Sequence, residues 1–333
     1  MDYQSFLQSK ARRIENKGIE PSPVNPILFE WQKQIVEWSL KRGQCAIFSD
    51  CGTGKTFMQI EWARQILDHC MPERDFEARL LIVAPLSVAS QTIAEAERLG
   101  VRIEYKLEPD DSSGIWITNY QRLHKFTGVL FDGIVLDESS ILKSLDGKTR
   151  DLLLKEFTGI PYRLCCTATP SPNDLTELGN HAEFLGAASR REMLANYFVH
   201  DSKFSAQDGY RLKGHAQGAF WEWVAQWAVY VRRPSDLGHE DGDFILPALN
   251  ITEIVTESNF IPDGKLFPDM PAGIQGRTRA RRDTLSKRVE AAGEIIGASG
   301  EQWIVWHDLN DEGRDLARVL GDEVGELLLV VRV

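Results

Sequence analysis

The sequence contains no long apolar run: nowhere among its 333 residues do eighteen apolar residues follow one another, which excludes an ordinary membrane-spanning helix. The opening stretch from Met1 to Arg13 carries basic side chains without the apolar segment of a secretory signal. The five cysteines form no Cys-x-x-Cys pair, so neither a disulfide framework nor a four-ligand zinc site is indicated. We therefore expect a cytoplasmic protein without a membrane partner.

Basic residues are in the minority, since 38 lysines and arginines stand against 49 acidic residues and leave a formal charge of −11. Neutralising nucleic-acid phosphates requires clustered lysine and arginine, so this balance argues against a protein that coats nucleic acid non-specifically. Hydrophobic residues make up 43% of the chain, which is long enough for two domains of ordinary size.

Between residues 45 and 170, short apolar runs alternate with helical or polar stretches, the pattern of parallel strands joined by crossover helices. Each run has the continuous apolar character of a strand buried on both faces. The sequence therefore predicts an α/β fold built on a doubly wound parallel sheet. The five runs are Cys45 to Phe48, Leu80 to Ala84, Ile115 to Thr118, Gly133 to Leu136 and Arg163 to Cys166.

A glycine-containing segment from Ser49 to Thr56 follows the first strand and opens a helix whose apolar stripe runs towards Cys70. Backbone N–H groups of such a loop, together with the helix N-terminus, can surround phosphate oxygens. In this phosphate-binding loop, Lys55 is predicted to reach the β and γ phosphates of ATP, and Thr56 to supply a hydroxyl ligand to Mg²⁺. The predicted contacts to ATP come from Asp50, Cys51, Gly52, Thr53, Gly54, Lys55 and Thr56.

Two carboxylates, Asp137 and Glu138, end the fourth predicted strand. Asp137 can hold the metal's water shell, and Glu138 can orient the water that attacks the γ phosphate. Acidic residues at a strand end are often surface turns, but beside a phosphate-binding loop the pair is typical of a nucleotide hydrolase. We therefore predict ATP and Mg²⁺ as cofactors, Lys55, Asp137 and Glu138 as catalytic residues, and Thr56 and Asp137 as metal ligands.

These motifs, with further blocks in the same order, resemble the Swi/Snf-related branch of superfamily 2 helicases and translocases over residues 28 to 320. The resemblance implies that Gln32 hydrogen-bonds adenine and that an aromatic, Phe29 or Trp31, packs beside the base; alternatively, these rings fill the core. It also implies contacts to a nucleic-acid backbone, in particular that of double-stranded DNA. The residues implied are Pro85, Leu86 and Ser87 after the second strand and Asn119 and Tyr120 after the third.

A block that couples hydrolysis to movement in this family matches Thr167, Ala168 and Thr169. The histidine of the family's Asp-Glu-x-His motif is replaced here by Ser140. A serine hydroxyl can donate one hydrogen bond to Thr167 or Thr169 but cannot carry charge. The resemblance therefore implies weaker coupling, with hydrolysis still possible.

The resemblance also implies how the chain divides, into lobes with the RecA-like form of a P-loop fold. A stretch rich in tryptophan and tyrosine without strand alternation predicts a helical insertion, and proline and glycine residues beyond it predict a linker. Further on, Leu285 to Ile296 and Glu312 to Leu320 are helix-like, and Trp303 to Trp306 is strand-like. The predicted units are an N-terminal extension (1–27), a RecA-like ATP-binding lobe (28–186), a helical insertion (187–250), a linker (251–284) and a partial second RecA-like lobe (285–333).

The family's Gln-x-x-Gly-Arg-x-x-Arg block, whose arginine stabilises charge on the transferred phosphoryl group, does not occur in the sequence. Loss of such an arginine typically costs on the order of a thousandfold or more in hydrolysis. We therefore expect a chain truncated within the second lobe, with the arginine supplied by a missing C-terminal portion or a partner chain. Arg233-Pro234-Ser235-Asp236 is similar to phage and prophage members, which implies a bacterial or phage-infected cell.

Two functions stay open on this basis. The first is an ATP-dependent DNA helicase or translocase, in which hydrolysis of Mg-ATP is coupled to movement on DNA. The second is a nucleotide-binding module without motor activity, or a motor part that another chain completes.

Overall fold

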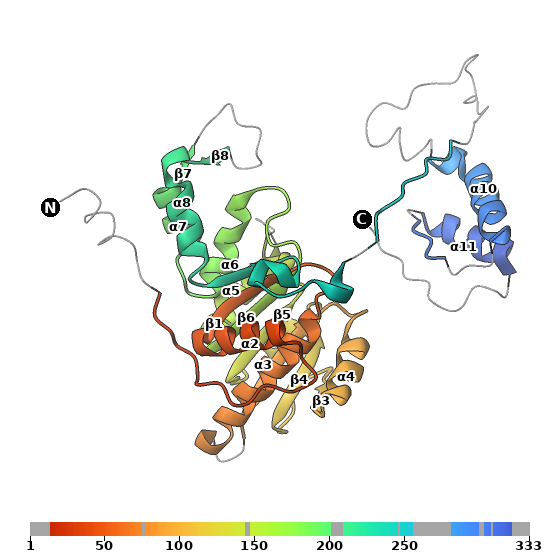
Figure 1. The fold of residues 1–333 in the computed structure, drawn as a ribbon. Helices are drawn as coiled ribbons and strands as arrows, with labels where there is room; N and C mark the ends of the chain where they lie inside the picture. The colour runs from red at the N-terminus through yellow and green to blue at the C-terminus, as the bar shows by residue number, and fades with distance from the viewer. Residues whose placement is uncertain are drawn as a thin grey trace. The chain divides into compact units, whose positions relative to one another are not determined.

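The computed structural model divides the chain into two units, Met1–Leu246 and Pro247–Val333, which are described separately here. In the first unit, a parallel sheet of seven strands runs in the order β3-β4-β2-β5-β6-β1-β9 (Figure 1). The predicted α/β fold with a parallel sheet is confirmed. The residues described are 14–74, 77–143, 147–200, 209–245, 247–255, 281–299, 303–307 and 309–321.

The five predicted strands all lie in this sheet, each with one or two residues more than its apolar run. Their side chains are buried on both faces, as β5 illustrates with five buried residues of five. Because all the strands run parallel, their carboxyl ends meet at one edge of the sheet, where the polar motifs follow. The strands are β1 (Gln44–Ser49), β2 (Arg79–Ala84), β3 (Ile103–Tyr105), β4 (Gly114–Asn119), β5 (Gly133–Asp137), β6 (Tyr162–Thr167) and β9 (Ala228–Val231).

Helices cover both faces of the sheet, and alternate side chains of β1 show the two layers. Cys45 and Ile47 belong to the core beneath α2, α3 and α4, whereas Ala46 and Phe48 belong to the core on the opposite face. Helix α2 begins with an acidic residue, ends with two basic ones and stops at Gly43, where φ is 72°. The helices are α2 (Glu30–Arg42), α3 (Lys55–Cys70) and α4 (Ala89–Arg98) on one face, and α5 (Lys148–Glu156), α6 (Leu178–Phe184), α7 (Arg190–Tyr197) and α8 (Gln217–Val224) associated with the other.

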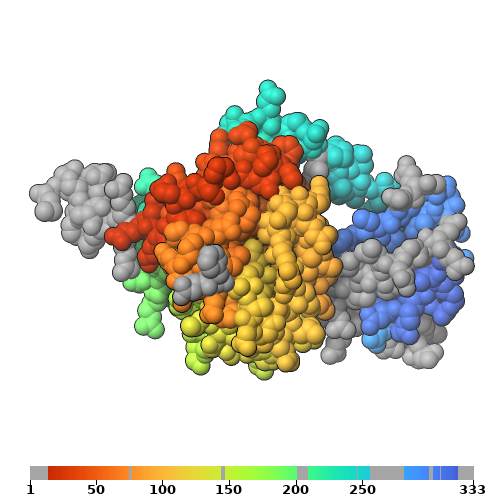
Figure 2. Space-filling view, turned by 90° about the horizontal axis from the view of Figure 1, so that it is seen from below, coloured from red at the N-terminus to blue at the C-terminus, as the bar shows by residue number. Residues whose placement is uncertain are grey.

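Short 3₁₀ turns connect these elements, and the stretch before α2 packs against the loop that follows α4. Asn25 Nδ2 donates to the Leu99 carbonyl at 3.0 Å. Figure 2 shows this N-terminal part of the chain, in red, on the same face as the orange segments that follow it. The 3₁₀ turns are η1 (Pro72–Arg74), η2 (Leu123–Phe126), η3 (Ser139–Lys143), η4 (Leu175–Glu177), η5 (Gly214–Ala216), η6 (Pro234–Leu237) and η7 (Gly242–Phe244).

Residues 187–250, predicted to form a helical insertion, contain strands as well as helices. β7 (Phe198–His200) and β8 (Tyr210–Leu212) form an antiparallel pair, and β9 adds to the main sheet beside β1. β9 escapes a pattern search because it has four residues and a mixed burial pattern, with Tyr230 41% exposed. The division of the chain into a lobe and an insertion stays a prediction.

The second unit contains helices α10 (Leu285–Gly297) and α11 (Asn310–Leu320), close to the predicted helices. Arg288 of α10 forms an ion pair with Glu312 of α11 at 3.2 Å. The strand expected at Trp303 to Trp306 is wrong: those residues are not in a strand, and Ile304 is 83% exposed without the burial that would favour one. Most of the predicted linker, residues 256–280, lies outside the described residues. No helix in the described part of the chain is long and apolar enough to cross a bilayer.

Candidate nucleotide-binding site

The phosphate-binding loop joins the end of β1 to the start of α3, as the sequence predicts. Gly52 and Gly54 both have left-handed backbones, with φ of 78° and 76°, a conformation that glycine adopts without strain. At Gly54 a Cβ atom would also lie 2.5 Å from Gln32 Nε2, so that amide would have to move. The loop therefore turns tightly and aims the N-terminus of α3 at the carboxyl edge of the sheet.

Hydrogen bonds within the loop hold the Lys55 ammonium over it. Lys55 Nζ donates to the Ser49 carbonyl at 2.8 Å and to the Asp50 carbonyl at 2.9 Å. Thr53 Oγ1 also donates to the Asp50 carbonyl at 2.6 Å, and the Asp50 carboxylate accepts from Cys51 N at 2.7 Å. The ammonium is thus placed where phosphate oxygens could take over from the two carbonyls as its partners.

Gln32 ties the predicted adenine-binding block to this loop. Its Nε2 donates to the Thr53 carbonyl at 2.9 Å, and its Oε1 accepts from Phe29 N at 3.0 Å. Of the two aromatic candidates, Trp31 is 3% exposed and belongs to the core, whereas Phe29 is 56% exposed. Phe29 is therefore the ring that is open to a base.

Phe244 is a residue at this end of the site that the sequence did not indicate. Its ring lies 5.2 Å from the rings of both Phe29 and Trp31, edge-on in each case. Phe244 belongs to η7 and follows Phe29 by more than 200 residues in the sequence. The turn contains a glycine but no recognisable motif. Only the tertiary structure brings the three rings together.

The two predicted catalytic carboxylates end β5 in an unusual backbone conformation. Asp137 is buried, and this burial, followed by the nearby Glu138 charge, raises its pKa to about 6. Glu138 has a φ of 51°, the one left-handed backbone outside glycine in the described residues. Its N–H donates to Asp137 Oδ1 at 3.1 Å. The two carboxylates also have different partners, since Asp137 accepts from the Glu138 N–H and Glu138 accepts from Thr167 Oγ1.

The predicted coupling block contacts Glu138 directly. Thr167 Oγ1, at the end of β6, donates to Glu138 Oε2 at 3.2 Å, and Thr169 N donates to Thr167 Oγ1 at 3.1 Å. The expected bond from Ser140 is not formed: in the described structure, Ser140 donates to neither threonine. Ala168 lies between the two threonines in the same turn. The structure therefore links Glu138 to Thr167 without an intermediate residue.

A histidine does lie beside the acidic motif, although it comes from another element. His181 of α6 is fully buried, its Nε2 lies 3.2 Å from Ser139 Oγ, and its ring packs edge-on against Phe48 at 5.4 Å. Burial lowers the pKa of His181 to about 4, so the ring is neutral at physiological pH. A single sequence gives no sign of this contact, because the two residues are 42 positions apart.

This burial predicts a pH-dependent stability. Below an ordinary histidine pKa of 6.5 the unfolded chain takes up a proton at position 181, whereas the folded protein does so only near 4. Acidification from pH 6.5 to about pH 4 therefore lowers the free energy of unfolding by about 3 kcal/mol through His181. Asp137, whose folded pKa is raised, acts in the opposite direction over an overlapping range, so the wild-type curve alone does not isolate His181.

The measurement is urea unfolding of the wild type and of His181→Gln between pH 7 and pH 4. The stability difference between them is expected to move by about 3 kcal/mol in favour of the variant as the pH falls. Because Asp137 is common to both proteins, its contribution cancels. Parallel pH curves for the two proteins contradict the assignment.

The predicted nucleic-acid residues fall into two groups. Pro85, Leu86 and Ser87 follow β2 at the carboxyl edge, and the Leu86 side chain is 62% exposed. Asn119 and Tyr120 are buried instead: Asn119 Nδ2 donates to the Tyr105 hydroxyl at 2.9 Å, and the Tyr120 hydroxyl donates to the Asp137 carbonyl at 2.7 Å. In this conformation only the first group presents a side chain to a ligand.

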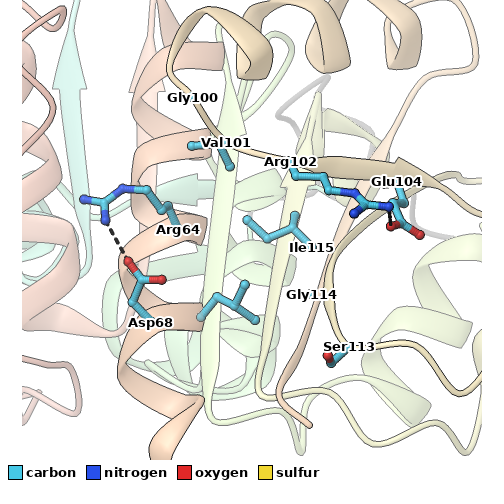
Figure 3. Close-up of a pocket in the computed structure, with 10 residues that line it drawn as sticks. Arg64, Asp68, Gly100, Val101, Arg102, Glu104, Ser113, Gly114 and Ile115 are labelled. Atoms are coloured by element: carbon cyan, nitrogen blue, oxygen red, sulfur yellow. Dashed lines mark hydrogen bonds and ion pairs between the residues drawn. The ribbon is translucent and has the colours of Figure 1, made fainter. Parts of the chain in front are cut away.

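A hollow of about 340 Å³ lies away from these motifs (Figure 3). It is lined by Gly114 and Ile115 at the start of β4, and so lies at the amino edge of the sheet. Its charged residues are already paired, Arg64 with Asp68 at 2.7 Å and Arg102 with Glu104 at 2.7 Å. The hollow therefore offers no free charge for a phosphate.

Several residues around Asp137 have the chemistry that a hydrated Mg²⁺ requires. Thr56 lies in the first turn of α3, which packs on β5, the strand that ends in Asp137. A hydroxyl and a carboxylate are oxygen ligands of the kind that Mg²⁺ prefers, with waters filling the other positions. Gln59, on the same helix, contributes a buried amide without a hydrogen-bond partner. The residues present thus fit the metal that the loop implies.

No family model matches the chain, but other known proteins are similar to it. The ATP-dependent helicase brm of Drosophila melanogaster is 27% identical over 202 residues, which cover 53% of this chain and 12% of the fly protein. The SWI2/SNF2 ATPase core of Sulfolobus solfataricus in complex with dsDNA has a TM-score of 0.50 at 20% identity, covering 64% of this chain and 46% of the archaeal one. A second structure, of the SWI2/SNF2 ATPase core domain of Sulfolobus solfataricus, gives a TM-score of 0.48 at 19% identity and covers 68% of this chain and 46% of the archaeal one. The chain is thus similar in sequence to part of the fly helicase, shares the fold of the archaeal ATPase core, and spans less than half of each protein compared.

Proposed function

We propose that this relative of the Swi2/Snf2 ATPases binds and hydrolyses Mg-ATP and couples hydrolysis to movement on double-stranded DNA. The observation that supports the proposal most is the hydrogen bond from Thr167 Oγ1 to Glu138 Oε2 at 3.2 Å. It joins the side chain that would orient the attacking water to the block that follows β6. A change at the γ phosphate can therefore reach Thr167 through one contact.

The binding chemistry follows from the loop and its neighbours. The loop N–H groups and Lys55 would hold the β and γ phosphates, and Gln32 with Phe29 would hold the base. Thr56 and Asp137 would hold Mg²⁺, which when bound neutralises charge on the phosphate oxygens. Glu138 would orient the water and accept its proton.

Contact with DNA is proposed for the exposed turn after β2. Leu86 and its neighbours Pro85 and Ser87 lie at the same edge of the sheet as the phosphate-binding loop. The archaeal ATPase core that shares this fold is in complex with dsDNA. Asn119 and Tyr120 would support that surface from beneath, because Tyr120 bonds to the Asp137 carbonyl. On this proposal, DNA contact and nucleotide contact lie at one edge of one sheet.

The test is ATP hydrolysis by the purified chain with and without linear double-stranded DNA. DNA is expected to raise the rate of hydrolysis, because contact at the carboxyl edge would bias the turn that carries Glu138. Equal rates with and without DNA contradict the coupling.

Leu86→Glu is expected to weaken DNA binding by about tenfold or more, because it places a negative charge beside DNA phosphates. The matched control is Leu130→Glu: Leu130 is 75% exposed but precedes β5, at the opposite edge of the sheet. DNA affinity measured by fluorescence anisotropy should fall in the first variant only. An equal loss in both variants would show a general effect of charge. No loss of affinity in either variant would show that DNA does not bind at this turn.

The alternative function is a nucleotide-binding module without motor activity, or a motor part that another chain completes. ATP binding by calorimetry with no turnover above background supports this alternative, and turnover restored by a second protein that carries the arginine supports a completed motor. We also propose that the protein is of the phage or prophage type and that it is located in the cytoplasm.

A further inference from the structure

We propose that Gln59 is a positioning residue of the metal site: its amide nitrogen orients the Asp137 carboxylate, and its amide oxygen accepts a hydrogen bond from a water bound to Mg²⁺. The inference rests on the proposed function, in that Mg-ATP must bind at this edge. It assigns a residue of α3 that belongs to none of the motifs in the sequence.

Gln59 lies where a residue that supports the metal ligands, without binding the metal itself, is expected. It is three residues beyond Thr56 in α3 and therefore on the same side of the helix as the predicted hydroxyl ligand. α3 packs against β5, whose last residue is Asp137. Gln59 thus belongs to the helix that begins at the phosphates and packs on the strand that ends at the metal ligand.

The Gln59 amide is fully buried and unsatisfied. Its relative exposure is 0%, and neither Nε2 nor Oε1 has a hydrogen-bond partner in the described structure. Buried side-chain polar atoms nearly always have a partner in the protein or in ordered water. An amide with both ends open at a ligand site is therefore explained most directly by partners that arrive with the ligand.

Another glutamine of the same helix shows that burial in α3 does not by itself leave an amide open. Gln65 is 2% exposed, and both of its polar atoms are bonded. Its Oε1 accepts from Ser22 N at 2.8 Å, and its Nε2 donates to the Ser22 carbonyl at 3.2 Å and to Glu61 Oε1 at 2.8 Å. The two glutamines differ in what they face, which for Gln59 is Asp137.

The approach of Gln59 to Asp137 has an electrostatic effect. The Gln59 amide lies beside the Asp137 carboxylate, although the geometry falls short of a full hydrogen bond. On this proposal the bond forms when the metal binds, and it then polarises the carboxylate. A carboxylate held in this way presents its other oxygen in a fixed direction, which is what a metal with strict octahedral geometry requires.

The two ends of the amide fit two different partners. The nitrogen donates and suits a carboxylate, and the oxygen accepts and suits the O–H of a metal-bound water. Mg²⁺ keeps several of its waters in protein sites, so such a water is available. Methionine has nearly the same length and shape but offers neither a donor nor a strong acceptor, which makes Gln59→Met the informative substitution.

The experiment measures binding of a fluorescent ATP analogue at increasing Mg²⁺ concentrations, without relying on hydrolysis. In Gln59→Met the half-saturating Mg²⁺ concentration is expected to rise about tenfold or more, as is usual when an outer partner of a metal ligand is removed. Nucleotide affinity in EDTA should stay at the wild-type value, because the loop and Gln32 are untouched. A merely structural role for Gln59 would lower the melting temperature without separating these two affinities.

Gln65→Met is the matched control, since it removes buried amide bonds from the same helix away from Asp137. It should lower the melting temperature and leave the half-saturating Mg²⁺ concentration unchanged. If Gln59→Met does not fold, Gln59→Asn, whose amide is one methylene shorter, should show the same rise. An unchanged Mg²⁺ requirement in the folded Gln59 variant, or an equal rise in the control, overturns the inference. Wild-type protein that binds the analogue without any Mg²⁺ dependence overturns the proposed function itself.

Discussion

Replacing Glu138 with glutamine is expected to slow ATP hydrolysis by about 10²- to 10⁴-fold, the usual contribution of a positioned general base. Glutamine keeps the shape of the side chain and can still accept the hydrogen bond that Thr167 Oγ1 donates to Glu138 Oε2. What it loses is the ability to accept a proton from the attacking water. Nucleotide affinity should therefore stay near its wild-type value.

The measurement pairs single-turnover hydrolysis of labelled ATP with binding of a fluorescent analogue to the same protein. Glu183→Gln serves as the control, because Glu183 of α6 also accepts a hydrogen bond, from Arg190 N at 3.0 Å, but lies outside the candidate site. The control should hydrolyse ATP at the wild-type rate. If Glu138→Gln hydrolyses ATP within a few fold of the wild-type rate, another residue accepts the proton from the attacking water.

The conformation of Glu138 explains why glutamine is the right substitution. A left-handed backbone costs a residue with a side chain roughly 1 to 2 kcal/mol, and Glu138 has a φ of 51°. Glycine would relieve this strain but would remove the side chain, so two effects would mix. Glutamine leaves the backbone cost unchanged, and the difference between the two proteins then reports on the carboxylate.

The features that the sequence predicted are those written in neighbouring residues. Strands such as β5 are continuous apolar runs because both of their faces are buried, and a run of that kind is visible without any tertiary information. The phosphate-binding loop is equally local, since Gly52, Gly54 and Lys55 lie within four consecutive residues. Those predictions needed only the order of the residues.

The features that the sequence did not predict depend on residues distant in the chain. β9 is recognisable only from its partner, because Val229 pairs with Ile47 of β1 and its own four residues carry no alternation. His181 and Phe244 likewise gain their positions from packing, the first against Phe48 and the second against Phe29. The burial of Asn119 and Tyr120 has the same cause: both belong to a block that resembles a nucleic-acid contact in sequence, and the tertiary fold buries them.

Replacing Lys55 with alanine is expected to abolish most of the affinity for ATP. The ammonium would donate to oxygens of the β and γ phosphates, and a hydrogen bond to a charged group contributes about 1.5–3 kcal/mol. Two such bonds correspond to a loss of about 10²- to 10⁴-fold in affinity, since 1.4 kcal/mol is a factor of ten. In the structure, Lys55 Nζ bonds to the Ser49 and Asp50 carbonyls, so the variant also leaves those groups without the ammonium.

A series of nucleotides separates the effect on phosphate contact from the effect on the loop. AMP carries no β or γ phosphate, so its affinity, measured by calorimetry, should hardly change in Lys55→Ala, whereas that of ATP should fall steeply and that of ADP by an intermediate amount. If the loop collapsed instead, all three affinities would fall together, because Gln32 bonds to the Thr53 carbonyl and the base site depends on that loop. Lys41→Ala, at the exposed end of α2, is the matched control and should leave the three affinities unchanged. An ATP affinity in Lys55→Ala equal to wild type would mean that the phosphates bind elsewhere than over the loop between β1 and α3.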